Sequence, residues 1–471
     1  MPLDLDVLPD VFEAKTWAEI VARAGSSTYP QWAKQAARCG YCANPIRLVG
    51  RVLADDQVVY DTSREPDGVL LKRCGNRRAF VCPSCSFEYA GDMWQLLYAG
   101  LAGGRKGLPE SIPEHPMVFV TLTAPSFGRV HSLRERNGQA QRCRPRRGHP
   151  LCPHGRPMWC MSIHHPNDPD VGQALCPDCY DYTGAVLFNW RAPEMWRRFT
   201  INVRRCLAVR LEVRDAQLGD VVRISFAKVA EFQRRGIVHF HAIIRLDAPG
   251  DTWQPPPIYV STDVLQEAVS DAIERTRLVE EATEGEAVAL RWGSENDIQP
   301  IRNRLDLAEG QLTPEKVAAY IAKYTIKGAE DFGVGNRPLD GPEARRRGLP
   351  EHVVRMIDTA DQLAAVQGFE RLARWTHMLG FRGHFATKSR RFSITLGSIR
   401  RARADYRRRQ DLERRGLVRE LGDDQGDEDT TLLVGEWRFV GIGYTTNGDA
   451  ALAAASASYA REWREVMGRT R

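Results

Sequence analysis

Residues 221–247 read VVRISFAKVAEFQRRGIVHFHAIIRLD, and this stretch decides the fold. Both halves are rich in β-branched and apolar residues, and Arg234-Arg235-Gly236 stands between them. This pattern predicts a β-hairpin with a three-residue loop, because strands favour such residues and loops interrupt them. Gly236 is expected to adopt the left-handed conformation that a loop of this length needs.

The loop length also fixes which residues face one another across the hairpin. Glu231 is expected opposite His239, and His239 and His241 are two residues apart, so both histidines project from one face of the sheet. A His-x-His pair on a strand is more often a plain polar face, but this strand is otherwise apolar and the carboxylate falls in register. The three side chains therefore predict a binding site for Mg²⁺ or Mn²⁺ that leaves coordination positions open for substrate oxygens.

A second motif lies downstream, where residues 313–328 read TPEKVAAYIAKYTIKG. Thr313 suits the N-cap position, Pro314 the first helical position and Glu315 the positive end of the helix dipole. Gly328 can end the segment. These signals predict one helix.

On that helix Tyr320 and Tyr324 are one turn apart, with Lys323 and Lys327 beside them. Tyrosines at helical spacing usually pack in a core, but a purely apolar contact would not favour the interleaved lysines. A phenol with a pKa near ~10 is a poor nucleophile at neutral pH, and a nearby ammonium group or metal-bound phosphate favours its anion. The pair is therefore a candidate nucleophile pair.

Together these motifs resemble the HUH endonucleases, in particular the initiators of rolling-circle replication. His239-Phe240-His241 matches their His-hydrophobe-His motif, and residues 320–324, YIAKY, match the paired-tyrosine motif of isometric single-stranded DNA phage initiators. Residues 119–123, FVTLT, resemble their first strand motif, and the order of the motifs agrees. Over most of the chain the resemblance is to replication initiators of actinobacterial, Streptomyces-type plasmids and integrative conjugative elements.

The resemblance implies an α+β fold with an HUH-type antiparallel β-sheet, flanking helices and Cys-rich zinc-binding modules. It implies a metal-dependent, site-specific DNA endonuclease and strand transferase that nicks one strand at the double-strand origin. Tyr324 or Tyr320 would form a 5′-phosphotyrosyl intermediate and leave a 3′-hydroxyl primer, while Lys323 and Lys327 would stabilise charge. Tyr324 is favoured slightly, because related initiators can carry a carboxylate at the position of Tyr320. The implied partners are single-stranded DNA at the nick, the duplex origin, and the host helicase and polymerase.

The chain has eleven cysteines, several of them in Cys-x-x-Cys pairs, which predicts zinc sites rather than disulfides in a chain with no export signal. Four thiolates leave no open position on zinc, so such sites are expected to be structural. The first predicted set is Cys39, Cys42, Cys82 and Cys85, with Cys74 as an alternative ligand. The second predicted set is Cys152, Cys160, Cys176 and Cys179, with Cys143, His154, His164 and His165 as alternatives.

These patterns divide the chain into three expected regions: a Cys-rich region at 1–110, a nickase domain at 111–330 with a zinc module inserted at about 143–182, and a basic region at 331–471. Between Arg382 and Arg415 twelve basic residues stand against three acidic ones, which indicates a surface for duplex DNA although the whole chain carries a net charge of only +6. The N-terminus shows no basic-then-apolar signal and no long apolar run appears, so a soluble cytoplasmic protein without membrane contact is expected.

Two other functions remain as alternatives. A conjugative relaxase or a transposase would use the same chemistry, but the chain lacks the Gly-x-x-x-x-Gly-Lys-Ser/Thr pattern of a helicase-fused relaxase. A non-catalytic, zinc-containing DNA-binding regulator would explain the cysteines and arginines. This alternative does not explain why the carboxylate, histidine and tyrosine motifs occur together.

Overall fold

The computed structural model describes residues 13–54, 56–250, 253–283, 286–301, 312–414 and 433–469. The chain forms two compact units, Met1–Asp92 with Gly397–Arg471 and Met93–Leu396. The first and last parts of the chain therefore belong to one unit, whereas the sequence suggested three consecutive regions. No helix in the described ranges is long and apolar enough to cross a membrane.

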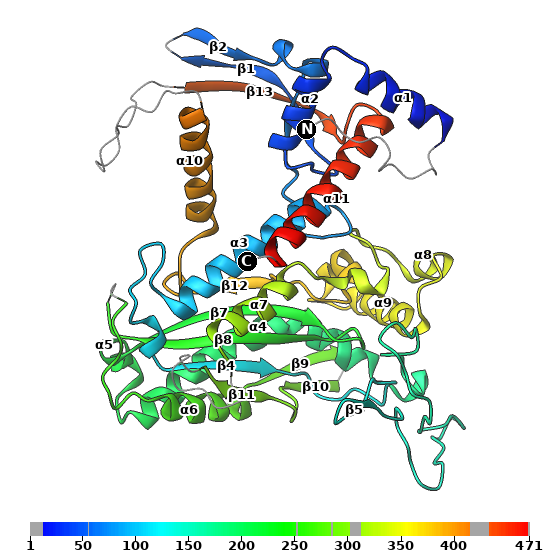
Figure 1. The fold of residues 1–471 in the computed structure, drawn as a ribbon. Coiled ribbons are helices and arrows are strands. Elements are labelled where there is room, and N and C mark those ends of the chain that lie inside the picture. Colours follow the sequence, from blue (N-terminus) through cyan, green and yellow to red (C-terminus); the bar gives the residue numbers. More distant parts are fainter. Residues whose placement is uncertain are drawn as a thin grey trace. The chain divides into compact units, whose positions relative to one another are not determined.

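The larger unit is built on a five-stranded sheet with the order β11-β4-β8-β7-β12, in which every neighbouring pair is antiparallel (Figure 1). The strands are β4 (Met117–Leu122), β7 (Arg223–Phe232), β8 (Val238–Asp247), β11 (Asp297–Pro300) and β12 (Ala386–Lys388). The helices around the sheet make this unit α+β, as expected.

The hairpin at the centre of this sheet has the predicted register. Glu231 pairs with His239, and the backbone N–H of Gln233 donates to the carbonyl of Ile237 at 2.9 Å. Gly236 has a φ of 73°, and a Cβ atom there would lie 2.8 Å from both the Leu379 and Met356 side chains. Glycine is therefore favoured by the backbone conformation, and a larger residue would also have to displace the ends of the Leu379 and Met356 side chains.

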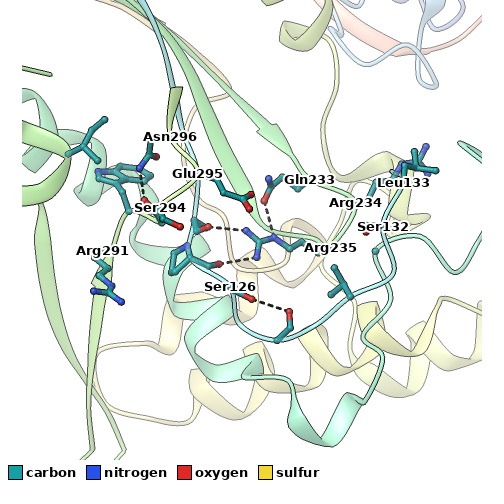
Figure 2. Close-up of a pocket in the computed structure, with 18 of the residues that line it drawn as sticks. Ser126, Ser132, Leu133, Gln233, Arg234, Arg235, Arg291, Ser294, Glu295 and Asn296 are labelled. Atoms are coloured by element: carbon teal, nitrogen blue, oxygen red, sulfur yellow. Dashed lines mark hydrogen bonds between the residues drawn. The ribbon is translucent and has the colours of Figure 1, made fainter. Parts of the chain in front are cut away.

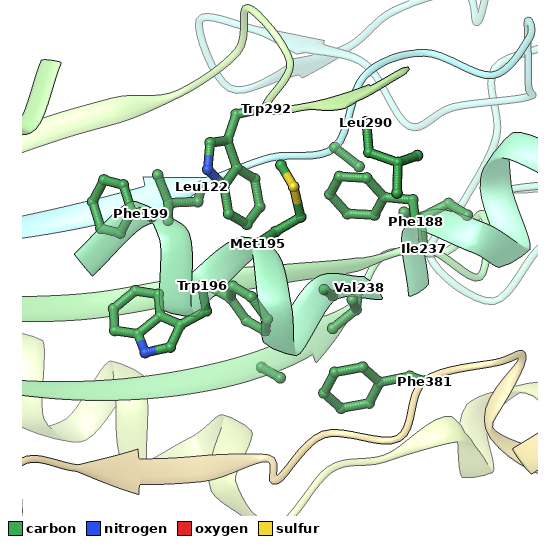
Figure 3. Close-up of a cluster of buried hydrophobic side chains, with 14 of the residues drawn as sticks. Leu122, Phe188, Met195, Trp196, Phe199, Ile237, Val238, Leu290, Trp292 and Phe381 are labelled. Carbon is green, nitrogen blue, oxygen red and sulfur yellow. The ribbon is translucent and has the colours of Figure 1, made fainter. Parts of the chain in front are cut away.

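The main core lies between this sheet and helix α4 (Tyr182–Arg210), as Figure 3 shows. Apolar residues at helical spacing in the sequence favour a helix over residues 193–212, but in the structure this helix begins eleven residues earlier and contains Pro193. Asp181 caps the helix by accepting from the N–H of Gly184 at 2.7 Å. The first turns are also almost fully buried, so tertiary packing outweighs the cost of the proline.

Two other predicted helices are shorter than expected. The sequence pattern favours a helix over residues 262–281, but α6 (Thr262–Arg275) ends earlier, and the chain then forms β9 (Arg277–Thr283), which pairs with β10 (Glu286–Arg291). The sequence pattern also favours a helix over residues 353–379, but the structure divides this stretch into α9 (Glu351–Ala364) and a 3₁₀ segment, η9 (Glu370–Met378). Gly368 lies between them with a φ of 92°, a conformation that a continuing helix excludes.

The opposite face of the sheet carries helix α7 (Pro314–Thr325), which packs against β7 (Figure 1). The last part of α3 (Pro83–Ala102) also lies there, since the Gly100 carbonyl accepts from the guanidinium of Arg245 on β8. The remaining elements of this unit are α5 (Leu218–Val221), α8 (Gly341–Arg346), β5 (Glu135–Arg136), β6 (Gln139–Ala140) and the 3₁₀ segments η4 (Ile112–Glu114), η5 (Pro177–Cys179), η6 (Asp215–Gln217) and η8 (Ala329–Phe332).

The smaller unit is organised by a second antiparallel sheet of order β13-β1-β2, with β3 also pairing with β1. Its strands are β1 (Ile46–Ala54), β2 (Gln57–Asp61), β3 (Leu70–Lys72) and β13 (Leu433–Ile442). Its helical elements are α1 (Ala14–Ala24), α2 (Tyr29–Arg38), η2 (Thr62–Arg64), η3 (Pro66–Gly68), α10 (Leu396–Arg414) and α11 (Asn447–Arg469). The pairing of β1 with β13 joins the two ends of the chain, which is why they form one unit.

Candidate functional site

Glu231, His239 and His241 converge as predicted at the centre of the five-stranded sheet. Oε2 of Glu231 lies 3.0 Å from Nε2 of His239 and 3.2 Å from Nε2 of His241. The three ligand atoms lie within 4.8 Å of one another. One carboxylate oxygen and two imidazole nitrogens at this spacing fit a divalent cation such as Mn²⁺ or Mg²⁺, with coordination positions left over.

The protonation states of these groups also suit a cation. Burial raises the pKa of Glu231, but hydrogen bonds to His239 and His241 outweigh burial and bring this pKa to about 2. Burial lowers the pKa of His241 against the opposing attraction of Glu231. At neutral pH the site therefore holds a carboxylate and at least one neutral imidazole, the forms that ligate metals.

Strand β4 supports His241 from its other side. Oγ1 of Thr121 lies 3.1 Å from Nδ1 of His241, which leaves Nε2 to point at Glu231. The ring of Phe119 stacks on the His241 ring with a centroid distance of 5.7 Å. In the sequence, Phe119 and Thr121 belong to a strand motif, but no local pattern assigns them a contact with His241. Only the register, in which Thr121 pairs with His241, reveals the contact.

Helix α7 brings both tyrosines to the same place. Oη of Tyr320 lies 3.5 Å from Nε2 of His241, and the ring centroids of Tyr320 and Tyr324 are 4.8 Å apart. The Tyr324 ring is 5.6 Å from the His241 ring. Burial, a hydrogen bond to Tyr324 and the negative charge of Glu231 together raise the pKa of Tyr320. Its phenol therefore needs a nearby cation or a base before it can attack.

The two lysines of α7 lie beside the second tyrosine. Nζ of Lys327 is 5.2 Å and Nζ of Lys323 is 6.0 Å from the centre of the Tyr324 ring. Such distances place two positive charges beside the Tyr324 ring, where they can attract a phosphate group.

Capping and a contact with α3 hold α7 in this orientation. Oγ1 of Thr313 accepts from the N–H of Lys316 at 3.2 Å, as the sequence predicts for an N-cap. Oη of Tyr98 on α3 donates to Oε1 of Glu315 at 3.2 Å. The apolar face of α7, including Val317 and Ile321, is buried.

The first cysteine set gathers in the smaller unit, with one change of membership. Sγ of Cys42 lies 3.7 Å from Sγ of Cys82 and 3.6 Å from Sγ of Cys85, while Cys74 lies 3.7 Å from Cys85. Tetrahedral zinc with Zn–S bonds of ~2.3 Å requires sulfur atoms about 3.8 Å apart. Cys74, considered as an alternative ligand, therefore completes the tetrad, and Cys39 stands next to it in contact with Cys42.

The second cysteine set does not gather around one point. Cys152, Cys176 and Cys179 lie together, and His154 completes this group with its Nδ1 atom 3.2 Å from Sγ of Cys179. Cys160 lies instead in a different group of ligand atoms, with His131, Cys143 and His164. The sequence could not separate the two groups, because their members alternate along the chain.

A cavity of about 1230 Å³ opens beside the loop of the hairpin (Figure 2). The guanidinium of Arg235 donates to the side chain of Gln233 and to the backbone carbonyls of Ala124 and Pro125. These three partners are neutral, Glu295 is a carboxylate that attracts the Arg235 charge, and the lining holds more cationic than anionic side chains. The charged lining residues are Arg144, Arg234, Arg235, Arg277, Arg291, Glu274 and Glu295.

The basic stretch 382–415 falls partly on α10, and its last residue, Arg415, lies outside the described residues. Arg403 forms ion pairs with Glu88 and Asp92, so part of the positive charge is used within the smaller unit. Arg401 and Arg409 are exposed.

Comparison with known proteins gives two matches. The family described as "RepSA: Replication initiator protein, pSAM2" matches residues 28–458. A replication initiator protein of Streptomyces ambofaciens is 40% identical over 462 residues, which cover 96% of this chain and 95% of that protein. No solved structure matches the chain.

Proposed function

Because the chain belongs to the RepSA family of replication initiator proteins, we propose that it starts rolling-circle replication by nicking one DNA strand through a tyrosine. As a replication initiator the protein binds DNA. The proposal concerns the chemistry, which we assign to an HUH-type site on the five-stranded sheet.

The observation that carries this proposal is the meeting of the histidine hairpin and the tyrosine helix at one point. The phenol of Tyr320 lies 3.5 Å from Nε2 of His241, and that nitrogen lies 3.2 Å from the Glu231 carboxylate. A regulator that only binds DNA does not need a nucleophile beside a cation-binding site. A strand-cleaving enzyme needs both within reach of one phosphate.

In the proposed reaction, Glu231, His239 and His241 hold Mg²⁺ or Mn²⁺, which supplies Lewis-acid stabilisation of the scissile phosphate when bound. The phenolate oxygen of Tyr324 or Tyr320 attacks phosphorus, and the bond from phosphorus to the 3′-oxygen breaks. The 3′-oxygen takes up a proton and becomes a free hydroxyl, while the 5′-phosphate stays on the tyrosine. Lys323 and Lys327 stabilise negative charge on the phenolate and the phosphate.

Two tyrosines allow a second transfer without hydrolysis. The first tyrosine remains linked to the 5′-phosphate while the 3′-hydroxyl primes synthesis by a host polymerase behind a host helicase. The second tyrosine can then cut the regenerated origin, and the phosphotyrosyl bond conserves the energy for rejoining. The proximity of the two rings, 4.8 Å between centroids, supports this relay.

We also propose that the protein carries structural zinc. The tetrad of Cys42, Cys74, Cys82 and Cys85 has sulfur spacings that suit tetrahedral Zn²⁺. The group of Cys152, His154, Cys176 and Cys179 offers three thiolates and one imidazole. Four protein ligands leave no open position, so both ions would stabilise the fold and take no part in cleavage.

Two basic surfaces are proposed to contact DNA. The arginines of the cavity in Figure 2 would bind the backbone of the single strand near the nick. The exposed arginines of α10 would bind duplex phosphates at the origin. Each surface contributes affinity that falls with salt.

The test uses an oligonucleotide that spans the origin of the element encoding this protein, labelled at either end. With Mn²⁺, a 3′ label should move with the protein on a denaturing gel, whereas a 5′ label should appear on a shorter free fragment ending in a 3′-hydroxyl. Chelator should abolish both products. Failure to form any adduct on either origin strand, with Mn²⁺ binding verified, would reject the nicking function.

A further inference from the structure

The irregular segment between β4 and α4 contains a second group of potential metal ligands, separate from the one that includes Cys176. Nδ1 of His131 lies 3.1 Å from Nε2 of His164, and this Nε2 lies 3.5 Å from Sγ of Cys160. Sγ of Cys143 is 4.0 Å from Nδ1 of His131. All four ligand atoms lie within 4.8 Å of one another.

These separations fit a tetrahedral zinc site. Zn–N bonds of ~2.0–2.1 Å and Zn–S bonds of ~2.3 Å place nitrogen atoms about 3.3 Å apart and nitrogen and sulfur atoms about 3.6 Å apart. The observed distances of 3.1, 3.5 and 4.0 Å scatter around these values. Two imidazole nitrogens and two sulfurs therefore surround a point at zinc-ligand distance.

The surrounding hydrogen bonds orient the ligands toward that point. Nδ1 of His164 lies 2.6 Å from Oδ2 of Asp168, so the opposite ring nitrogen, Nε2, is free to face the cluster. A carboxylate that fixes the tautomer of a ligating histidine in this way is a regular feature of zinc sites. Sγ of Cys143 accepts from the N–H of Ser132 at 3.2 Å, which holds this sulfur in its position.

We propose that His131, Cys143, Cys160 and His164 bind a structural Zn²⁺ that is distinct from the ion held by Cys152, His154, Cys176 and Cys179. Four protein ligands complete the coordination, so the site has a structural role. Cys160 therefore does not bind the same ion as Cys152, Cys176 and Cys179, although its sequence position suggested that it would. His131 is a ligand that lies outside every Cys-x-x-Cys motif.

The local structure explains why a metal is needed there. Cys143 and Cys160 lie on two segments joined by short antiparallel pairing, in which Cys143 donates to the Ser162 carbonyl at 2.9 Å. Most of the segment has no helix or strand, and small irregular regions of this kind gain stability from metals rather than from a core. His131, Ser132 and Arg144 also line the basic cavity, so the zinc would fix one wall of it.

The zinc content of the full-length protein tests this assignment, by native mass spectrometry and by elemental analysis. Cys160→Ser and Cys176→Ser should each lose one zinc ion per chain, and the double variant should lose two. Cys206→Ser serves as the control, because Cys206 is buried in the core away from every ligand group, and it should lose none. Asp168→Asn should keep the ion but weaken its affinity ~10–100-fold.

Four results would overturn the proposal. Loss of the same single ion from both single variants and from the double variant would mean one shared site, and no loss from Cys160→Ser would mean no ion there. A Cys143–Cys160 disulfide, detected by thiol counting under denaturing, non-reducing conditions, would also exclude the site.

If Cys160→Ser does not fold, Cys160→His should restore folding with the full zinc content. A folded Cys160→His that lacks one ion would contradict the assignment. These readouts do not depend on nicking.

Discussion

Oη of Tyr320 lies 3.5 Å from Nε2 of His241, although 79 positions separate the two residues in the sequence. This contact joins helix α7 to the central strand of the sheet. It puts one tyrosine directly beside the proposed cation site and the other one helical turn away.

Replacing one tyrosine at a time should separate the roles of the pair. If both tyrosines act in relay, Tyr320→Phe and Tyr324→Phe will each retain a single round of cleavage, because either phenol can reach the phosphate. Each should fail to cut and rejoin a substrate carrying two origins. The double variant should form no adduct, and measurable adduct from it would exclude both tyrosines.

Thr121→Val should weaken Mn²⁺ binding ~10–100-fold, because it removes the hydroxyl that contacts Nδ1 of His241 and fixes its tautomer. Valine keeps the shape and the strand preference of threonine. Isothermal titration calorimetry would measure the affinity, and Thr121→Ser, which keeps the hydroxyl, should retain most of it. Equal loss in both variants would assign the effect to packing.

The buried carboxylate of Asp247 should be a main determinant of stability. It accepts from Nε of Arg245 at 2.6 Å and from the Ser225 hydroxyl at 2.6 Å, and it lies 2.8 Å from Nδ1 of His115. Asp247→Asn leaves the Arg245 charge buried without its partner, which should cost about 3–5 kcal/mol in the free energy of unfolding. Glu436→Gln, which removes an exposed ion pair with Arg51, should cost less than about 1 kcal/mol by the same chemical denaturation.

The same residue predicts how stability responds to acid. Burial raises the pKa of Asp247, but hydrogen bonds from His115 and Arg245 and the Arg245 charge outweigh burial and leave it well below the usual value. Its contribution should therefore be complete above pH ~4, where the unfolded carboxyl is ionised, and should decline as the pH falls further. Asp247→Asn should flatten this part of the stability curve. An unchanged acid dependence would contradict the assignment.

Exposed arginines of α10 should contribute to duplex binding through counterion release. Arg401→Ala or Arg409→Ala should each lower the slope of log affinity against log salt by about one, and weaken specific and non-specific DNA alike. Fluorescence anisotropy over a salt series measures this slope. Arg197→Ala is the matched control. Arg197 is an exposed arginine on α4 that pairs with Glu194 of the same helix, and its replacement should leave the slope unchanged.

The sequence predicted the hairpin of β7 and β8 and its register well, because a period-two apolar pattern and a glycine at position 236 leave few alternatives. The cap at Thr313 likewise predicted α7 and the spacing of its tyrosines. Local patterns could not predict the first turns of α4, where burial outweighs Pro193, or the pairing of β1 with β13 across the chain. They also could not assign Cys74, His131 and Cys160 to ligand groups, because long-range folding decides which sulfur and nitrogen atoms meet.

The central claim is that a tyrosine of α7 becomes covalently linked to DNA. Trypsin cleaves after Lys316, Lys323 and Lys327, so Tyr320 and Tyr324 fall in separate peptides, 317–323 and 324–327. Mass spectrometry of the adduct formed with Mn²⁺, after nuclease and trypsin digestion, should find a phosphonucleotide on one or both of these peptides. A nucleotide on any other residue, or cleavage without a covalent intermediate, would contradict the account.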